Sequence, residues 1–431
     1  MFANNIFRQI ERTCSLMERT GIIQCIRGEA VAPLLCEHAR YWADKNSPAN
    51  ADSIEALVLT ALSQMYWYGS VRPTALYNVT LFKILKACSL FSFEVNGKPI
   101  VYCPDSDTSV VTHIASCING ALKPVCSATV YVENAPKNAI IQLREQIAEA
   151  RKYYIDEHGA WVEQFMQKLG DDVSRFSYES FLRQRIKAHA CWAMPTLEVN
   201  PPAQRTQWLQ ERALQHYELP TLEGAGLMLD FLHRTIYILD QYSLPGKVEA
   251  KPGDVVIDAG AAFGETAIYF SRKTNNTGRV FAFEPVPETA GFARRNAECN
   301  GCVNVTVIEK ALSDVTGLLH FSANELFPTA ARATTSTDSS SVDVHSITLD
   351  AFAAEKNIKI DFIKADVEGS EMNLLRGAEA TIKRDAPTIA MSLYHLQDDY
   401  HAIPKYLMSL RDDYTFYFRS DAEPVLLAVV E

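Results

Sequence analysis

The chain has 431 residues, of which 48% are apolar and 22% are charged, which is the composition of an ordinary soluble globular protein. A length of this size predicts two domains. The formal net charge of −11 argues against a broad nucleic-acid-binding face, because such faces need clustered Lys and Arg side chains. A local basic pocket for a single anionic ligand stays compatible with this charge.

No segment of the sequence has the pattern of a secretory signal or a membrane span. The first 28 residues carry charges throughout and contain no long apolar run. Eight of the ten cysteines lie before residue 195 as scattered single residues, as expected of free thiols in a reducing compartment. We therefore expect a cytoplasmic protein without a membrane span.

Residues 1–200 are predicted to form a mainly helical N-terminal region. Helices are expected over the first forty residues and over 53–69, 109–118 and 138–189. Strands are expected at 98–103 and 127–132, on either side of the third of these helices. This arrangement predicts a small βαβ unit within the helical region.

A proline-containing segment without periodicity, 192–202, predicts a linker between two domains. The second domain is expected to span 205–431, with helices over 206–242 and a core from 250 to 431. In this core, short apolar strands alternate with helices, which predicts a mostly parallel α/β sheet covered on both faces. The strands are expected at 255–259, 280–284, 304–309, 361–366, 388–393, 413–418 and 424–430. The last two form a hairpin that places one antiparallel strand in the sheet, and the Ser/Thr-rich run 334–341 is expected to be a loop.

A glycine-containing turn follows the first of these strands, at 258–264. Gly260 permits a tight turn and a close approach of a ligand, and Gly264 lets the next helix pack against the sheet. Asp258 at the strand end suits a ligand with an amino group and would repel a pyrophosphate. The third glycine of a dinucleotide fingerprint is absent, since Ala267 stands there.

Acidic side chains also end the second strand and the fourth. Glu284, in Phe283-Glu284-Pro285, can accept hydrogen bonds from both hydroxyls of a ribose, or it can cap the next helix. Lys364, Asp366 and Glu368 share one face if the strand stays extended through them. Three charges at the end of a buried parallel strand border the usual ligand crevice of such sheets.

Two further polar residues lie near this strand end in the sequence. Glu371 is expected in the first turn of the following helix, where it complements the helix dipole. His395 ends the next strand, where it can act as a base, bind a metal or serve a structural role.

Together these elements resemble the FkbM family of methyltransferases over about 250–420. The resemblance is carried by the turn at 258–264, Phe283-Glu284-Pro285, Ile347-Thr348-Leu349-Asp350, the segment 363–371 and Leu393-Tyr394-His395. The sequence Lys-x-Asp-x-Glu-Gly after Thr-Leu-Asp is its most specific part. Ala365 departs from a usual branched apolar residue, and Ser370 from a common alanine.

The resemblance implies a class I methyltransferase fold, S-adenosylmethionine as cofactor, and O-methylation of a hydroxyl on a sugar, glycan or nucleotide sugar. The turn would line the methionine part of the cofactor, Glu284 would hold its ribose, and residues near Lys310 would flank its adenine. The residues expected to bind the cofactor are Asp258, Gly260, Ala261, Gly264, Thr266, Glu284, Pro285, Lys310 and Ala311. The N-terminal region would present the acceptor or form contacts in a homodimer.

Catalysis by such an enzyme requires that the acceptor hydroxyl lose its proton. His395 or Asp366 can take this proton as a general base. Alternatively, Asp366, Glu368 and His395 can bind magnesium or manganese, which would lower the pKa of a chelated diol. Lys364 would hold the carboxylates in place or pair with an anionic substrate.

Two other functions stay open from the sequence. A nucleotide-dependent oxidoreductase would need the missing third glycine, and the terminal hairpin is typical of methyltransferases rather than NAD-binding domains. A catalytically silent scaffold that binds a glycan or a protein would be expected to have a degraded cofactor site. The intact set of Asp258, Gly260, Gly264 and Glu284 argues against a silent scaffold.

Overall fold

The structure is a computed structural model. It describes residues 22–25, 91–95, 98–102, 128–133, 145, 148–191, 203–322, 332–333 and 341–430. The chain divides into two compact units. One comprises residues 1–164 and 179–200, and the other comprises residues 165–178 and 201–431. The roles expected of the N-terminal region stay predictions.

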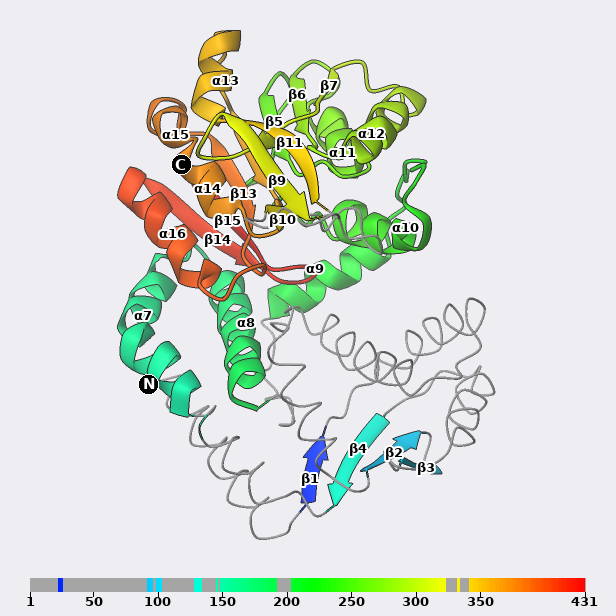
Figure 1. Cartoon of the computed structure of the whole chain (residues 1–431), viewed down its shortest axis with the longest axis vertical. Coiled ribbons are helices and arrows are strands. Elements are labelled where there is room, and N and C mark those ends of the chain that lie inside the picture. The colour runs from blue at the N-terminus through cyan, green and yellow to red at the C-terminus, as the bar shows by residue number, and fades with distance from the viewer. Residues whose placement is uncertain are drawn as a thin grey trace. The chain divides into compact units, whose positions relative to one another are not determined.

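The first unit contains a four-stranded antiparallel sheet in the order β1-β4-β2-β3 (Figure 1). The strands are β1 (Ile22–Cys25), β2 (Phe91–Val95), β3 (Lys98–Tyr102) and β4 (Ala128–Glu133). The two predicted strands are confirmed as β3 and β4. They run parallel to each other, but β2, which the sequence analysis missed, lies between them and pairs with both.

Most of the helices predicted before residue 130 lie outside the described residues, including those at 53–69 and 109–118. β1 falls within the first forty residues, and for these four residues the helix prediction is wrong. The helical prediction over 138–189 is confirmed where the chain is described. Helical residues there form the π-helical turn η1 (Lys152–Glu157), α7 (Gly159–Lys168) and α8 (Asp172–Cys191).

A seven-stranded sheet forms the centre of the second unit, in the order β14-β15-β13-β12-β5-β6-β7. Its strands are β5 (Val255–Ala259), β6 (Arg279–Phe283), β7 (Val305–Ile308), β12 (Phe362–Ala365), β13 (Thr388–Ser392), β14 (Tyr414–Arg419) and β15 (Val425–Val430). β15 runs antiparallel to both of its neighbours, and the other pairings are parallel. This order, with one reversed strand, is the class I methyltransferase fold that the sequence predicts.

Two groups of helices flank this sheet, as Figure 1 shows. The helices are α9 (Ala203–Ala213), the 3-10 turn η2 (Gly226–Met228), α10 (Leu229–Leu232), the π-helical turn η3 (His233–Ile238), α11 (Glu265–Lys273), α12 (Pro287–Cys299), α13 (Leu349–Lys356), α14 (Glu371–Arg376), α15 (Glu379–Asp385) and α16 (Asp399–Leu410). Helices α10, α11 and α12 form the green group, and α13 to α16 form the orange and red group. Because the sheet is covered on both faces, every residue of β5 and β12 is buried. Asp258 and Lys364 are the charged residues within these two strands.

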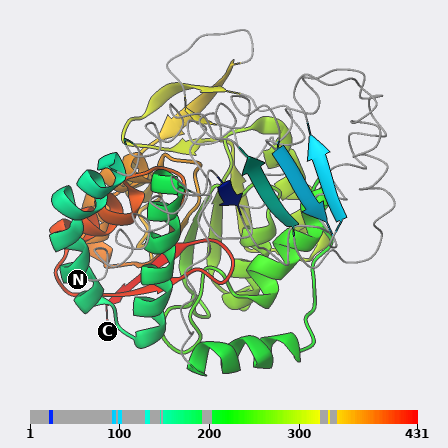
Figure 2. The same cartoon turned by 90° about the horizontal axis from the view of Figure 1, so that it is seen from below.

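A second, smaller sheet in this unit was missed by the sequence analysis. Its strands are β8 (Ala311–Leu312), β9 (Gly317–Ser322), β10 (Arg332–Ala333) and β11 (Ser341–Ile347), in the order β10-β9-β11-β8. Figure 2 shows β9 and β11 side by side in yellow. Ser341, predicted to end a loop, begins β11, and the rest of that loop lies outside the described residues. Glu309 and Lys310 alone separate β7 from β8, so this sheet starts directly at the end of the main sheet.

The Thr-Leu-Asp segment that carries part of the family resemblance caps two helices. The hydroxyl of Thr348 accepts the backbone N–H of Ala351 at 3.1 Å, at the start of α13. The carboxylate of Asp350 accepts the N–H groups of Ala380 at 3.0 Å and Thr381 at 2.7 Å, at the start of α15. Both side chains thus satisfy N–H groups that a helix leaves without a partner.

We predict that Asp350→Ala lowers the free energy of unfolding by about 1–2 kcal/mol, because two N–H groups of α15 lose their acceptor. Urea unfolding followed by circular dichroism measures this change. Glu355→Ala, at an exposed position of α13, is the control, since its ion pair with Lys356 is exposed and contributes little. Equal unfolding midpoints for both variants would contradict the capping role.

Candidate active site

The turn after β5 needs glycine at two positions. Gly260 has φ +77°, and a Cβ there would lie 1.9 Å from the backbone oxygen of Asp366. Gly264 has φ +86°, and its Cβ would lie 3.0 Å from the backbone of Ala293 in α12. The turn is therefore held tightly between the loop after β12 and helix α12, as the sequence predicts for close backbone packing.

A buried ion pair lies directly beneath this turn. The Lys364 ammonium donates to the carbonyl of Gly260 at 2.6 Å and lies 3.1 Å from Oδ1 of Asp258. Thr266 donates to the other Asp258 oxygen at 2.7 Å. Burial lowers the pKa of Lys364, but the carboxylates of Asp258, Asp366 and Glu265 raise it above its ordinary value, so the ammonium stays charged.

These contacts change the expected position of Asp258. The sequence analysis expects its carboxylate to face an amino group of the ligand, whereas the structure buries it completely, paired with Lys364 and Thr266. Lys364 is also buried, and it holds Asp258 and the turn in place rather than facing a substrate. A role of either residue in catalysis or binding stays a prediction.

Glu284 follows β6 at the same edge of the sheet. Its two carboxylate oxygens accept the N–H groups of Ala262 at 3.1 Å and Val286 at 2.9 Å. Burial raises the pKa of Glu284 to about 7, although these two N–H groups act in the opposite direction. Because Glu284 is held against the turn by hydrogen bonds, the alternative in which it only caps α12 does not account for its contacts.

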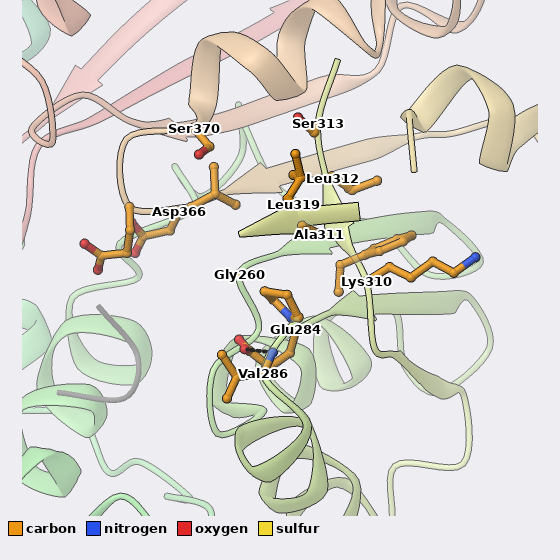
Figure 3. Close-up of a pocket in the computed structure, with 14 residues that line it drawn as sticks. Gly260, Glu284, Val286, Lys310, Ala311, Leu312, Ser313, Leu319, Asp366 and Ser370 are labelled. Atoms are coloured by element: carbon orange, nitrogen blue, oxygen red, sulfur yellow. Dashed lines mark hydrogen bonds between the residues drawn. The ribbon is translucent and has the colours of Figure 1, made fainter. Parts of the chain in front are cut away.

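A pocket of about 570 Å³, including its open mouth, lies at this edge of the sheet (Figure 3). Its lining comes from the ends of β5, β6 and β12 and from the smaller sheet. The lining residues are Gly260, Phe283, Glu284, Pro285, Val286, Lys310, Ala311, Leu312, Ser313, Leu319, Asp366, Val367, Glu368 and Ser370. Five residues predicted to bind a cofactor are among them: Gly260, Glu284, Pro285, Lys310 and Ala311. The remaining four, Asp258, Ala261, Gly264 and Thr266, lie outside this lining.

Asp366 and Glu368, predicted to be catalytic, also line the pocket, and His395 lies behind them. β12 ends at Ala365, so Asp366 and Glu368 lie in the following loop and not on one strand face with Lys364. Glu368 adopts a left-handed backbone with φ +54°. The imidazole Nε2 of His395 lies 3.4 Å from Asp366 and 3.5 Å from Glu368.

Glu371 has a role that the sequence analysis missed. It begins α14 as predicted, but its carboxylate accepts the N–H of Val367 at 3.0 Å and lies 2.8 Å from Nδ1 of His395. Burial lowers the pKa of His395, but the carboxylates of Glu371, Asp366 and Glu368 outweigh it and raise that pKa to about 9. The imidazole is therefore held as a cation among three carboxylates.

Two tyrosine hydroxyls bind the carboxylate of Asp366. Tyr242 donates to Oδ2 at 2.8 Å, and Tyr394 lies 3.1 Å from Oδ1. Tyr394 also lies 3.0 Å from the carboxylate of Glu423, in the turn between β14 and β15. Burial and the neighbouring Asp366 raise the pKa of Tyr242 well above its ordinary value, so Tyr242 acts as a donor. Tyr242 and Glu423 carry no motif, so no signal in the sequence marks them.

Glu265, the first residue of α11, is a further candidate that the sequence analysis did not single out. It is buried, and its Oε2 makes no hydrogen bond to the described part of the chain. Burial raises the pKa of Glu265 to about 8, with smaller contributions from Asp258 and Glu284. Its place directly after Gly264 is the signal that could have identified it.

Residues 258–416 match the family model of the methyltransferase FkbM domain. This segment is similar to methyltransferase FkbM domains. A methyltransferase 1 of Beauveria bassiana (strain ARSEF 2860) is 28% identical over 180 residues, which cover 36% of this chain and 70% of that protein. A protein-L-isoaspartate O-methyltransferase of Staphylothermus marinus is 27% identical over 125 residues, which cover 28% of this chain and 50% of that protein.

A solved structure of a methyltransferase FkbM from Methylobacillus flagellatus KT is also similar. It has a TM-score of 0.42 and 19% identity, and the match covers 66% of this chain and 62% of that chain. Tyr242 and Glu423 lie outside the segment matched by the family model, on either side of it. The described parts of the chain contain no helix long and apolar enough to cross a membrane.

We predict that the affinity for S-adenosylhomocysteine rises about tenfold from pH 6 to pH 8 if Glu284 holds a ribose in its ionised form. Its pKa of about 7 makes the carboxylate mainly protonated at the lower pH and mainly ionised at the higher one. Calorimetric titration at several pH values measures this, with Glu284→Gln as the variant that should lose the rise. An affinity independent of pH in the unmodified protein would argue against an ionised Glu284 as the ribose acceptor.

Proposed function

We propose that this protein is an S-adenosylmethionine-dependent O-methyltransferase that acts on a hydroxyl of a sugar, a glycan or a nucleotide sugar. The observation that carries the proposal is the position of Glu284. Its buried carboxylate lies against the turn after β5 and lines a pocket that also contains Asp366. A nucleoside in this pocket would place its ribose hydroxyls against Glu284.

The residues of the pocket fit this cofactor better than a dinucleotide. Glu284, Asp366 and Glu368 line it with carboxylates, which attract a sulfonium cation and repel a pyrophosphate. At Gly260 a Cβ would collide with the backbone of Asp366, so the tight turn that borders the pocket requires glycine. Lys310 and Ala311, where the smaller sheet begins, would flank the adenine.

Asp366 is the side chain best placed to take the proton from the acceptor. It lines the pocket and is 20% exposed, whereas the side chain of His395 is fully buried behind it. When bound, S-adenosylmethionine would supply the methyl group, which would pass from its sulfur to the acceptor oxygen and leave S-adenosylhomocysteine. The Asp366 carboxylate would accept the proton of that hydroxyl. Tyr242 and Tyr394 hold that carboxylate in place through their hydrogen bonds.

An acceptor with several hydroxyls suits the polar part of the pocket lining. The carboxylates of Asp366 and Glu368 accept hydrogen bonds from hydroxyls, and the hydroxyls of Ser313 and Ser370 both donate and accept them. These side chains could therefore accept hydrogen bonds from several hydroxyls of one sugar ring. These features support a sugar as the acceptor.

Calorimetric titration with S-adenosylhomocysteine tests the cofactor assignment. We expect micromolar binding that becomes at least tenfold weaker in Glu284→Ala. A hydrogen bond from a ribose hydroxyl to a charged carboxylate contributes about 1.5–3 kcal/mol, and the variant loses it. Glu288→Ala is the matched control, since Glu288 lies four residues further on and is exposed. If the unmodified protein shows no binding, the methyltransferase assignment fails and a silent scaffold becomes the better interpretation.

Turnover with S-adenosylmethionine and a panel of sugars tests the catalytic assignment. We expect Asp366→Asn to lose methyl transfer by about 100-fold or more while it retains S-adenosylhomocysteine binding, because the amide cannot accept the proton. Production of S-adenosylhomocysteine in the presence of each sugar is the measurement. A variant with unchanged turnover would remove Asp366 from its role as base.

A further inference from the structure

The imidazole of His395 lies among three carboxylates, with one nitrogen lacking a hydrogen bond. Its side chain is 0% exposed. Nδ1 lies 2.8 Å from Oε1 of Glu371, which is a normal hydrogen-bond distance. Nε2 is buried and makes no hydrogen bond to the described residues, yet it lies 3.4 Å from Oδ1 of Asp366 and 3.5 Å from Oε2 of Glu368.

The spacing around Nε2 is longer than a hydrogen bond and is close to that of atoms sharing one metal ion. With metal–ligand bonds of about 2.1–2.2 Å, neighbouring ligand atoms lie about 3 Å apart and opposite ones about 4.3 Å apart. The distances from Nε2 to Asp366 and Glu368 fall between these values.

Glu371 orients the ring as outer carboxylates orient histidines that bind metals. Its Oε1 accepts the backbone N–H of Val367 as well as Nδ1–H of His395, so that a metal ion would replace the proton on Nε2 and bind there. Asp366, Glu371 and His395 can also place one ligand atom each within 4.8 Å of one another. Oε1 of Glu371 accepts two N–H groups and binds Nδ1 of His395, whereas Oε2 of Glu368 lies 3.5 Å from Nε2. Glu371 is therefore given the orienting role and Glu368 the ligand role, although Oε2 of Glu371 makes no hydrogen bond to the described residues.

We infer that Asp366, Glu368 and His395 bind a divalent cation, with Glu371 as the carboxylate that positions the histidine. Two carboxylates and one imidazole favour manganese over magnesium, which prefers oxygen ligands alone. The inference rests on the proposed function, because Asp366 and Glu368 line the pocket in which the acceptor would lie. A cation there would bind an acceptor hydroxyl and lower its pKa, which would ease the loss of its proton.

The test uses manganese alone with the full chain after treatment with a chelator. We expect calorimetry to show one site, and pulsed electron paramagnetic resonance to show coupling between Mn²⁺ and an imidazole nitrogen. Asp366→Asn, Glu368→Gln and His395→Gln should each lower the affinity at least tenfold, and Glu371→Gln should lower it about 10- to 100-fold. Asp343→Asn is the matched control, because Asp343 forms an exposed pair with His320 on the smaller sheet.

Absence of nitrogen coupling in the unmodified protein would overturn the inference without need of any variant. So would an affinity for manganese that Asp366→Asn and Glu368→Gln leave unchanged. Titration of the same chelator-treated sample with S-adenosylhomocysteine separates the two proposals. Binding of S-adenosylhomocysteine without binding of manganese would contradict the cation site and would still support the cofactor assignment.

Discussion

The buried ammonium of Lys364 is the constraint on which the site depends. It lies at the centre of the sheet, between β12 and β5, where an unpaired charge would be very unfavourable. Its contacts with Asp258 and with the carbonyls of Ala259 and Gly260 satisfy it. The same contacts fix the shape of the turn that borders the pocket. A buried ion pair is weak support for stability, but here it defines a conformation.

A second constraint is the surplus of carboxylates around the pocket. Asp366, Glu368 and Glu371 surround His395, and Glu284 and Glu265 lie near Asp258. Burial and mutual repulsion raise the pKa of Glu284 to about 7 and that of Glu265 to about 8, so these groups exchange protons near neutral pH. Such a site favours positive charge in a ligand, as the sulfonium of the proposed cofactor would carry.

The pocket also depends on parts of the chain that lie apart from the strand ends of the main sheet. The smaller sheet supplies Ala311, Leu312 and Leu319 to its lining. Tyr242, before the matched domain, and Glu423, after it, complete the hydrogen-bond network around Asp366. The segments on either side of the stretch that matches the family model therefore contribute to the geometry of the site.

The sequence by itself determined the class of fold and the edge of the sheet where ligands bind. Alternating apolar segments and the closing hairpin identified all seven strands of the main sheet. The central strands β5 and β12 are fully buried and therefore consist of nearly continuous apolar residues. The motif positions of Gly260, Glu284 and Asp366 placed them at the ends of neighbouring strands, where the structure finds them together.

Only the tertiary structure decided which groups meet. Asp258 and Lys364 belong to different strands, and their pairing depends on the register between β5 and β12, which no local pattern encodes. Glu371 lies at the start of α14 and His395 lies after the end of β13, so their contact depends on how the two elements pack. The position of Glu371 in the first turn of a helix indicated only that it complements the helix dipole. Strands β8 and β10 have two residues each, and β9 and β11 carry polar side chains among the apolar ones, so no continuous apolar run marks this sheet in the sequence. Tyr242 binds Asp366 although 124 residues separate the two in the sequence. Glu423, in the terminal hairpin, contacts Tyr394, which in turn binds Asp366.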